Sequence, residues 1–117
     1  MFFSEQLWKL TSSGKLKCKY YDDLYSRNAL RNVSIPAEGT VGYIETYDKV
    51  LGVLNQSTAA GARVVLESKY NPMSEGQKWY KTTIDSDGWF TLTNPNSAKN
   101  LNEVPNDIGI GKDVQGK

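Results

Sequence analysis

The chain has 117 residues, of which 38% are hydrophobic and 23% charged, a balance that predicts one globular domain over residues 1–117. Its 14 basic and 13 acidic residues leave a net charge of +1, so no basic excess predicts a nucleic-acid partner. The chain has no histidine and one cysteine, Cys18, so it lacks the usual general base, the usual zinc ligand and any internal disulfide. We therefore expect no enzyme, no metal and no cofactor.

Short alternating runs of polar and apolar residues predict a series of β-strands. In chain order, strands are expected at residues 5–10, 15–20, 28–33, 40–46, 50–54, 64–66, 76–81, 88–92 and 108–110. Turn-forming residues separate them at 12–14, 35–39, 47–49, 55–61, 71–76, 85–88 and 93–97. No stretch has sustained helical periodicity, which favours an all-β sandwich or barrel.

The two ends of the chain are less patterned. Met1 and the two phenylalanines after it are followed at once by polar residues, so no signal-peptide apolar region is expected, and no apolar run is long enough to span a bilayer. Residues 112–117 are expected to form a frayed tail. The composition does not indicate a compartment.

Two Gln-x-Trp tripeptides stand at the start of alternating runs, one formed by Gln6 and Trp8 and the other by Gln77 and Trp79. With the strands and glycine turns around them, they resemble the repeats of ricin-type β-trefoil lectins. The resemblance implies a ricin B-like β-trefoil in which each tryptophan packs in the shared core. It also implies that each glutamine supports its tryptophan by hydrogen bonding.

The repeats are unequal in length. Glycine-started strands at Gly14, Gly42 and Gly88 mark three units, and the last of them lacks a Gln-x-Trp strand of its own. Residues 1–13 would supply it, so we expect a trefoil with one short repeat and with its cut point inside a repeat. A truncated three-repeat chain that pairs with another molecule would give the same pattern.

The resemblance also implies where sugars would bind. In such lectins a site combines an Asp before the long loop, an aromatic platform, and a polar residue just before the Gln of Gln-x-Trp. In the middle unit these two polar positions fall on Gly52 and Gly76, so no site is expected there. In the composite last unit they fall on Asn102 and Glu5, which makes this unit the expected site.

Further polar and aromatic groups stand near that unit in the sequence. Asn94 and Asn96 would add contacts, and Trp89 or Tyr80 would offer a stacking face. The alternative for each of them is structural, since asparagines make turns and aromatic residues close a core. Asp85 and Asp87 are expected to form a hairpin turn rather than a calcium loop, which needs more ligands.

The expected function is a non-enzymatic, lectin-like carbohydrate-binding module. A single shallow site should bind a mono- or disaccharide weakly, on the order of millimolar, so an oligomer would be needed for avidity. The alternative is a trefoil that binds protein, such as a protease inhibitor or a cytoskeletal or assembly module with no sugar site, because one fold hosts all of these.

Overall fold

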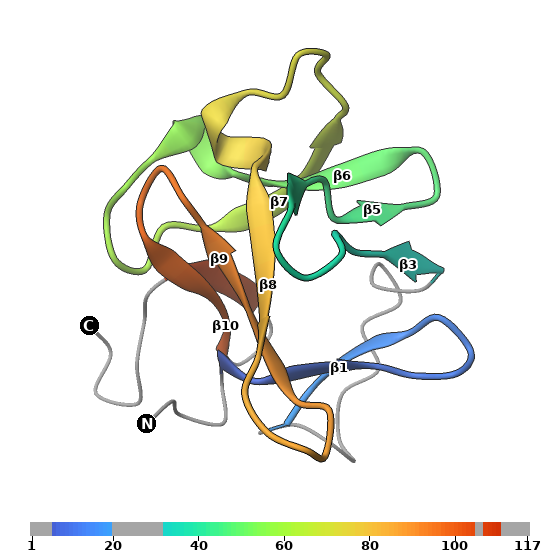
Figure 1. Cartoon of the computed structure of the whole chain (residues 1–117). Helices are drawn as coiled ribbons and strands as arrows, with labels where there is room; N and C mark the ends of the chain where they lie inside the picture. Colours follow the sequence, from blue (N-terminus) through green and yellow to red (C-terminus); the bar gives the residue numbers. More distant parts are fainter. Residues whose placement is uncertain (1–5, 20–31, 105–106, 111–117) are drawn as a thin grey trace.

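The computed structural model describes residues 6–19, 32–104 and 107–110, and these residues form an all-β fold (Figure 1). The strands are β1 (Trp8–Leu10), β2 (Leu16–Cys18), β3 (Val33–Ser34), β4 (Val41–Gly42), β5 (Glu45–Thr46), β6 (Lys49–Val53), β7 (Val64–Ser68), β8 (Trp79–Thr83), β9 (Phe90–Asn94), β10 (Lys99–Val104) and β11 (Asp107–Ile110). Two single turns of 3-10 helix, η3 (Leu54–Gln56) and η4 (Glu75–Gln77), stand between them. The all-β prediction is confirmed.

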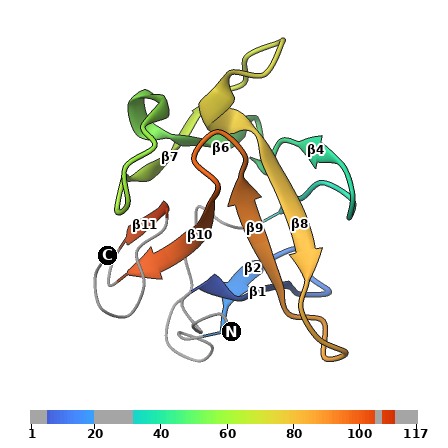
Figure 2. The ribbon, with the colours of Figure 1, turned by 60° about the vertical axis from the view of Figure 1, so that its left-hand side comes forward.

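The larger sheet is organised around β9, which is buried along its whole length. One edge of β9 pairs with β8, whose other edge pairs with β4. The opposite edge carries β1 near its start and β10 near its end (Figure 2). β2 extends the sheet beyond β1, and β11 extends it beyond β10. The N-terminal strand therefore lies beside the C-terminal part of the chain, next to β9 rather than β11.

The smaller sheet has the order β3-β5-β6-β7, and its main hairpin is formed by β6 and β7. Five residue pairs connect these two strands, among them Gly52 with Val65 and Val50 with Glu67. β6 is buried at every position after its first residue. This hairpin therefore contributes one inner wall of the core and, at its open end, the loops described below.

The two Gln-x-Trp tryptophans are bonded in the same way. Trp79 is completely buried and its indole N–H donates to the carbonyl of Leu51 on β6, at 3.0 Å. Trp8 is also completely buried, and its indole N–H donates to the carbonyl of Leu101 on β10, at 2.9 Å. Each of these leucines stands in a hairpin, β6–β7 or β10–β11. Trp79 thus fixes a hairpin of the smaller sheet to β8 of the larger sheet, and Trp8 connects β1 to β10 within the larger sheet, each through a buried hydrogen bond.

Several segments differ from the sequence-based prediction. β10, the longest of the described strands, was not predicted, and Gly76 and Gln77, expected to begin a strand, belong to η4. Residues 40–46 do not form one strand but two short ones, β4 and β5, which belong to different sheets. The chain turns inward between them, where Ile44 is buried in the core. Residues 93 and 94 were expected in a turn but complete β9, and the turn begins at Pro95. In these last two segments burial in the core outweighs the local residue pattern.

The turn before β9 agrees with the prediction. Asp85 accepts a hydrogen bond from the backbone N–H of Asp87 at 3.0 Å through its carboxylate, which is an Asx turn. Gly88 follows with a φ of 94°, a conformation that favours glycine. The described part of the chain contains no helix long and apolar enough to cross a membrane.

Candidate ligand-binding groove

Two of the three asparagines expected to bind sugar, Asn102 and Asn94, are buried. Asn102, on β10, is 1% exposed, and its amide nitrogen donates to the carbonyl of Glu103 at 3.3 Å. Its amide oxygen has no hydrogen-bond partner in the described part of the chain. The structure therefore gives Asn102 no surface for a sugar, because its side chain points into the protein beside the β10–β11 pairing.

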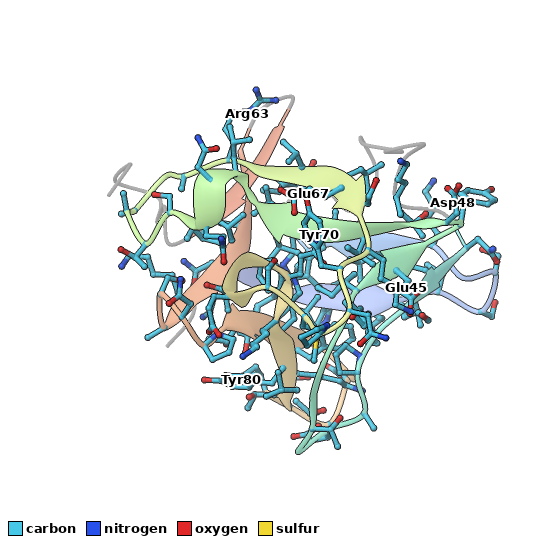
Figure 3. All side chains as sticks on the ribbon, turned by 90° about the horizontal axis from the view of Figure 1, so that it is seen from above. Glu45, Asp48, Arg63, Glu67, Tyr70 and Tyr80 are labelled. Atoms are coloured by element: carbon cyan, nitrogen blue, oxygen red, sulfur yellow. The ribbon has the colours of Figure 1, made fainter. Side chains whose placement is uncertain are left out.

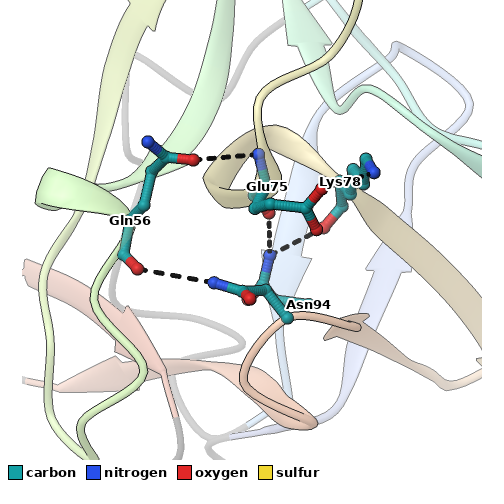
Figure 4. Close-up of polar contacts among 5 residues, drawn as sticks. Gln56, Glu75, Lys78 and Asn94 are labelled. Carbon is teal, nitrogen blue, oxygen red and sulfur yellow. Dashed lines mark hydrogen bonds and ion pairs between the residues drawn. The ribbon is translucent and has the colours of Figure 1, made fainter.

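Asn94 has a structural role, which was the alternative to sugar binding in the sequence analysis. Its amide nitrogen donates to the carbonyls of Glu75 and Lys78, at 3.0 and 2.9 Å, and its amide oxygen accepts from the backbone of Ser97 at 3.1 Å. These bonds connect the end of β9 to η4 and to the chain just beyond it (Figure 4). Because Asn94 is fully buried and its amide is fully used, it has no group left for a ligand.

Trp89 and Asn96 lie apart from each other. Trp89 precedes β9 and is 9% exposed, with the ammonium groups of three lysines around its ring. Lys9, Lys19 and Lys17 lie 4.4, 5.4 and 6.0 Å from the ring centroid, so the lysines cover the face that a sugar would need. Asn96 lies beyond the other end of β9, where it is exposed.

The other residues singled out in the sequence analysis are Gln6, Tyr80 and Glu5. Gln6 is buried at the edge of the core, and its amide oxygen accepts from Asn100 at 3.2 Å, which supports the hairpin that holds Trp8. Tyr80 is half-buried on β8. Glu5 lies outside the described residues. The predicted sugar-binding set is thus not brought together on one surface.

A groove does occur in the middle unit, between β6, η3, β7 and the loop that leads to η4. Its volume is about 570 Å³, within the range of small-molecule sites. Figure 3 shows Glu67 and Tyr70 next to each other at this place. The lining residues are Val53, Asn55, Gln56, Glu67, Tyr70, Asn71, Pro72 and Ser74.

No site was expected here because Gly52 and Gly76 have no side chains. In the structure, side chains of other residues occupy the space beside these two glycines. A Cβ atom at Gly52 would lie 2.0 Å from Oε1 of Glu67, so the Glu67 carboxylate lies directly over that glycine. Glu67 reaches this position because it is diagonal to Gly52 across the β6–β7 pairing. A Cβ atom at Gly76 would lie 3.2 Å from Cγ of Gln56. A carboxylate and an amide therefore occupy the space beside both glycines.

Gln77 forms hydrogen bonds with two parts of this groove, the Glu67 side chain and the loop that contains Tyr70. Its amide nitrogen donates to Oε1 of Glu67 and to the carbonyl of Ser68, both at 2.9 Å. Its amide oxygen accepts from the backbone N–H of Tyr70 at 3.1 Å. Gln77 is completely buried, and these partly buried bonds fix both Glu67 and the start of the Tyr70 loop.

Gln56, also in the groove lining, is held by hydrogen bonds to its side chain and to its backbone. The backbone N–H of Glu75 donates to its side-chain oxygen at 3.0 Å, and the amide of Asn96 donates to its backbone carbonyl at 3.4 Å (Figure 4). Asn55 and Gln56 both have positive φ angles, 57° and 54°, which are uncommon for residues other than glycine. The surrounding contacts hold this backbone in place, as is found at binding sites.

The groove offers one exposed aromatic face and several unused polar groups. Tyr70 is 56% exposed, and its backbone carbonyl accepts a hydrogen bond from the hydroxyl of Tyr43. Among the described residues, no hydrogen bond engages Oε2 of Glu67, the amides of Asn55 and Asn71, or the hydroxyl of Ser74. These groups can donate to and accept from a hydroxyl-rich ligand that packs against the Tyr70 ring.

Sequence reasoning assigned this unit no site because it considered only residues 52 and 76. Two signals were missed. Glu67 lies two positions beyond Val65, which pairs with Gly52, and the loop after it contains an aromatic residue, Tyr70, close to Pro72. No group of three or more metal-ligating side chains comes together in the described ranges. Carboxylate, amide, hydroxyl and aromatic groups line the groove, and this is the composition of a site for a polar organic ligand.

A separate, smaller hollow lies beside β4 and β8, and the carboxyl group of Glu38 forms part of its lining. The hydroxyl of Thr83 donates to Glu38 at 2.5 Å and its backbone N–H donates at 3.1 Å. These two bonds lower the pKa of Glu38 from its ordinary value, against a smaller opposing effect of burial and with a further lowering by the charge of Lys81. Glu38 thereby fastens the β3–β4 connection to the end of β8.

Comparisons of the chain with protein-family profiles, with curated proteins and with solved structures found no match.

Proposed function

We propose that the chain is a ricin B-like β-trefoil whose N-terminal strand belongs to its last repeat. Two observations support this assignment. The indole groups of Trp8 and Trp79 donate to leucine carbonyls in corresponding hairpins, as repeats of one unit would do. The N-terminal strand β1 pairs with β9, which places it beside the C-terminal unit that lacks a Gln-x-Trp strand.

We propose further that the protein is a non-enzymatic carbohydrate-binding module and that the groove around Tyr70 is its site. The observation that carries this proposal is the pairing of an exposed tyrosine with a fixed carboxylate, Glu67, in one groove. Sugars combine an apolar ring face with hydroxyl groups, so they require an aromatic platform beside amide and carboxylate groups. Tyr70 supplies the platform, and Glu67, Asn55 and Asn71 supply the polar groups.

Binding without catalysis fits the charge content of the groove. Glycoside hydrolysis generally uses two carboxyl groups on either side of the scissile bond. Glu67 is the only acidic residue among those that line the groove. The proposed role of Glu67 is therefore to accept hydrogen bonds from sugar hydroxyls.

A second candidate function, protein binding, is favoured by a different surface. Val41 is 48% exposed and lines a hollow of about 680 Å³ together with Met73 and Pro95. Glu75, Lys78 and Asn96 form the polar part of its lining. An apolar hollow with a polar rim is suited to a side chain of another protein.

A glycan array with three forms of the protein tests the carbohydrate proposal. Wild-type protein should bind a defined set of glycans, and Tyr70→Ala should lose them because it removes the stacking face. Tyr47→Ala is the matched control, since Tyr47 is 67% exposed in the β5–β6 turn and lies outside the groove. An array on which wild-type protein binds nothing, or on which the two variants behave alike, would reject this site and favour protein binding.

A further inference from the structure

We propose that the groove selects sugars that carry a free ammonium group over neutral and acidic sugars, with Glu67 as the residue that sets this preference. The inference rests on the proposed carbohydrate-binding function and names the class of sugar. It depends on the charge of the groove and on the position of that charge beside Tyr70.

The groove carries one negative charge that no basic residue of its lining balances. Glu67 is the only charged residue among the lining residues, all of which belong to the described part of the chain. One of its carboxylate oxygens, Oε1, accepts from Gln77 at 2.9 Å. The other, Oε2, makes no hydrogen bond within the described residues, so it can accept from a ligand.

The nearest lysine along the chain is directed elsewhere. The ammonium group of Lys69 lies 3.2 Å from the carboxylate of Glu45 and 4.5 Å from the centroid of the Tyr43 ring. Both of those residues lie outside the groove lining. Lys69 therefore does not neutralise Glu67, although only one residue separates the two in the sequence.

An ammonium group would find two favourable partners in this groove. It could form an ion pair with Glu67, and it could lie over the exposed ring of Tyr70, whose π-electrons attract cations. An acidic sugar would meet the opposite situation, because its carboxylate would approach Glu67 with no compensating cation. A neutral sugar would keep its hydrogen bonds but would lack both charge-dependent contacts.

The size of the preference follows from the exposure of the groove. A partly exposed ion pair and a cation–π contact together correspond to roughly a three- to tenfold difference in affinity. Because the site is open to solvent, added salt should reduce the difference. Acetylation of the amine should abolish it, since the amide that results carries no charge.

The experiment compares glucose, glucosamine and N-acetylglucosamine by NMR titration at about pH 6, where an amine of this kind is protonated. Wild-type protein should bind glucosamine roughly three- to tenfold more tightly than the other two sugars. Glu67→Gln should remove this difference, so that glucosamine and glucose bind with equal affinity, both more weakly than to wild type because a neutral amide replaces the carboxylate that accepts from sugar hydroxyls. The amide still offers Gln77 an oxygen, so the fold around the groove should be kept. Its thermal unfolding curve would verify that the variant is folded.

Asp48→Asn is the matched control. Asp48 is exposed in the turn between β5 and β6, far from Glu67 in Figure 3, and its substitution removes the same charge. This variant should keep the glucosamine preference. Equal loss in both variants would overturn the role of Glu67, because net charge alone would then explain the effect.

The other outcomes separate this inference from the function on which it rests. Equal binding of glucose and glucosamine by wild-type protein would overturn the ammonium preference and leave carbohydrate binding in place. Binding of none of the three sugars, or of n-butylamine as tightly as glucosamine, would overturn both, since the sugar ring would then contribute nothing.

Discussion

The side-chain nitrogen of Gln77 lies 2.9 Å from Oε1 of Glu67, and this contact joins the core of the protein to its groove. Gln77 belongs to the Gln-x-Trp motif, so it is two residues from Trp79 and completely buried. Its other hydrogen bonds go to the carbonyl of Ser68 and the backbone N–H of Tyr70. None of these three hydrogen bonds goes to Trp79, which Gln77 was expected to support; they orient the carboxylate and the aromatic loop of the proposed site instead.

The hydrogen bond between Gln77 and Glu67 predicts how stability changes when these two side chains are exchanged. Gln77→Glu should destabilise the protein by about 1–3 kcal/mol, because a buried donor is replaced by a carboxylate that faces both Glu67 and a carbonyl. Adding Glu67→Gln should restore part of that loss, since an amide can again donate to a carboxylate across the same contact. The free energy of unfolding, measured by urea denaturation, checks both variants. If the two losses simply add, the two side chains do not interact.

The contact between Gly52 and Glu67 leads to a second prediction. Gly52→Ala places a Cβ atom 2.0 Å from Oε1 of Glu67, so the carboxylate must leave its position over β6. Sugar binding should weaken severalfold, and the displaced carboxylate should lose its bond to Gln77. Isothermal titration and a crystal structure of the variant would measure these effects.

Gly42→Ala is the control for that experiment. A Cβ atom at Gly42 would meet Pro36 at 3.4 Å, an ordinary contact, so this substitution should leave binding unchanged. Full sugar affinity in Gly52→Ala would show that the position of Glu67 does not matter for binding.

Most of the described strands of this protein could be predicted from local patterns in the sequence, but β10 was not predicted, and residues 40–46 form two strands instead of one. Alternation places Leu16 and Cys18 inward, and the resemblance to Gln-x-Trp repeats implies that Trp8 and Trp79 lie in the core; all four are buried. The groove could not be predicted in this way, because it depends on pairing register. Glu67 covers Gly52 only because β6 and β7 pair Gly52 with Val65, and no local pattern contains that information.

The position of Asn102 could not be predicted for a related reason. Asn102 was expected to contact a sugar, but it pairs with Gly109 in a part of the β10–β11 hairpin where residues 101–103 and 108–110 are all buried. Asn94 was also expected to contact a sugar, but its buried amide nitrogen donates to the carbonyl of Glu75 in η4, where a backbone N–H could otherwise donate. In both cases tertiary packing determines exposure, and a residue-by-residue transfer from a family pattern does not include it.

The tryptophan core provides a stability test. Trp79→Ala should cost about 3–5 kcal/mol, as a large-to-small substitution in a packed core, and Trp8→Ala should cost a similar amount. Trp79→Phe should cost less but more than the lost volume implies, because the carbonyl of Leu51 loses its donor. Thermal unfolding measures all three variants. A melting temperature within a few degrees of wild type for Trp79→Ala would contradict its place in the core.

The contact between Glu38 and Thr83 predicts a pH effect. Since the pKa of Glu38 is lowered in the folded protein, its contribution to stability is present above the ordinary value of 4.5 and is lost as the pH falls through the folded pKa. Thr83→Val removes the hydroxyl that contributes most to this shift, so the pKa of Glu38 should rise toward 4.5.

An NMR titration of the Glu38 carboxyl carbon measures that pKa directly. Thr82→Val is the control, because Thr82 is the exposed neighbour and is not bonded to Glu38 in the described contacts. The same titration curve in wild type and Thr83→Val would show that the hydroxyl does not stabilise the carboxylate.

The most direct test of the carbohydrate assignment is an amide NMR titration of ¹⁵N-labelled wild-type protein with the glycan that binds best on the array. We predict saturable shifts at the backbone amide of Tyr70 and at the side-chain amides of Gln77 and Asn55, while the resonances of Asn102 stay in place. Shifts centred on Asn102 instead, or no shifts at tens of millimolar sugar, would contradict the assignment of the groove as a sugar site.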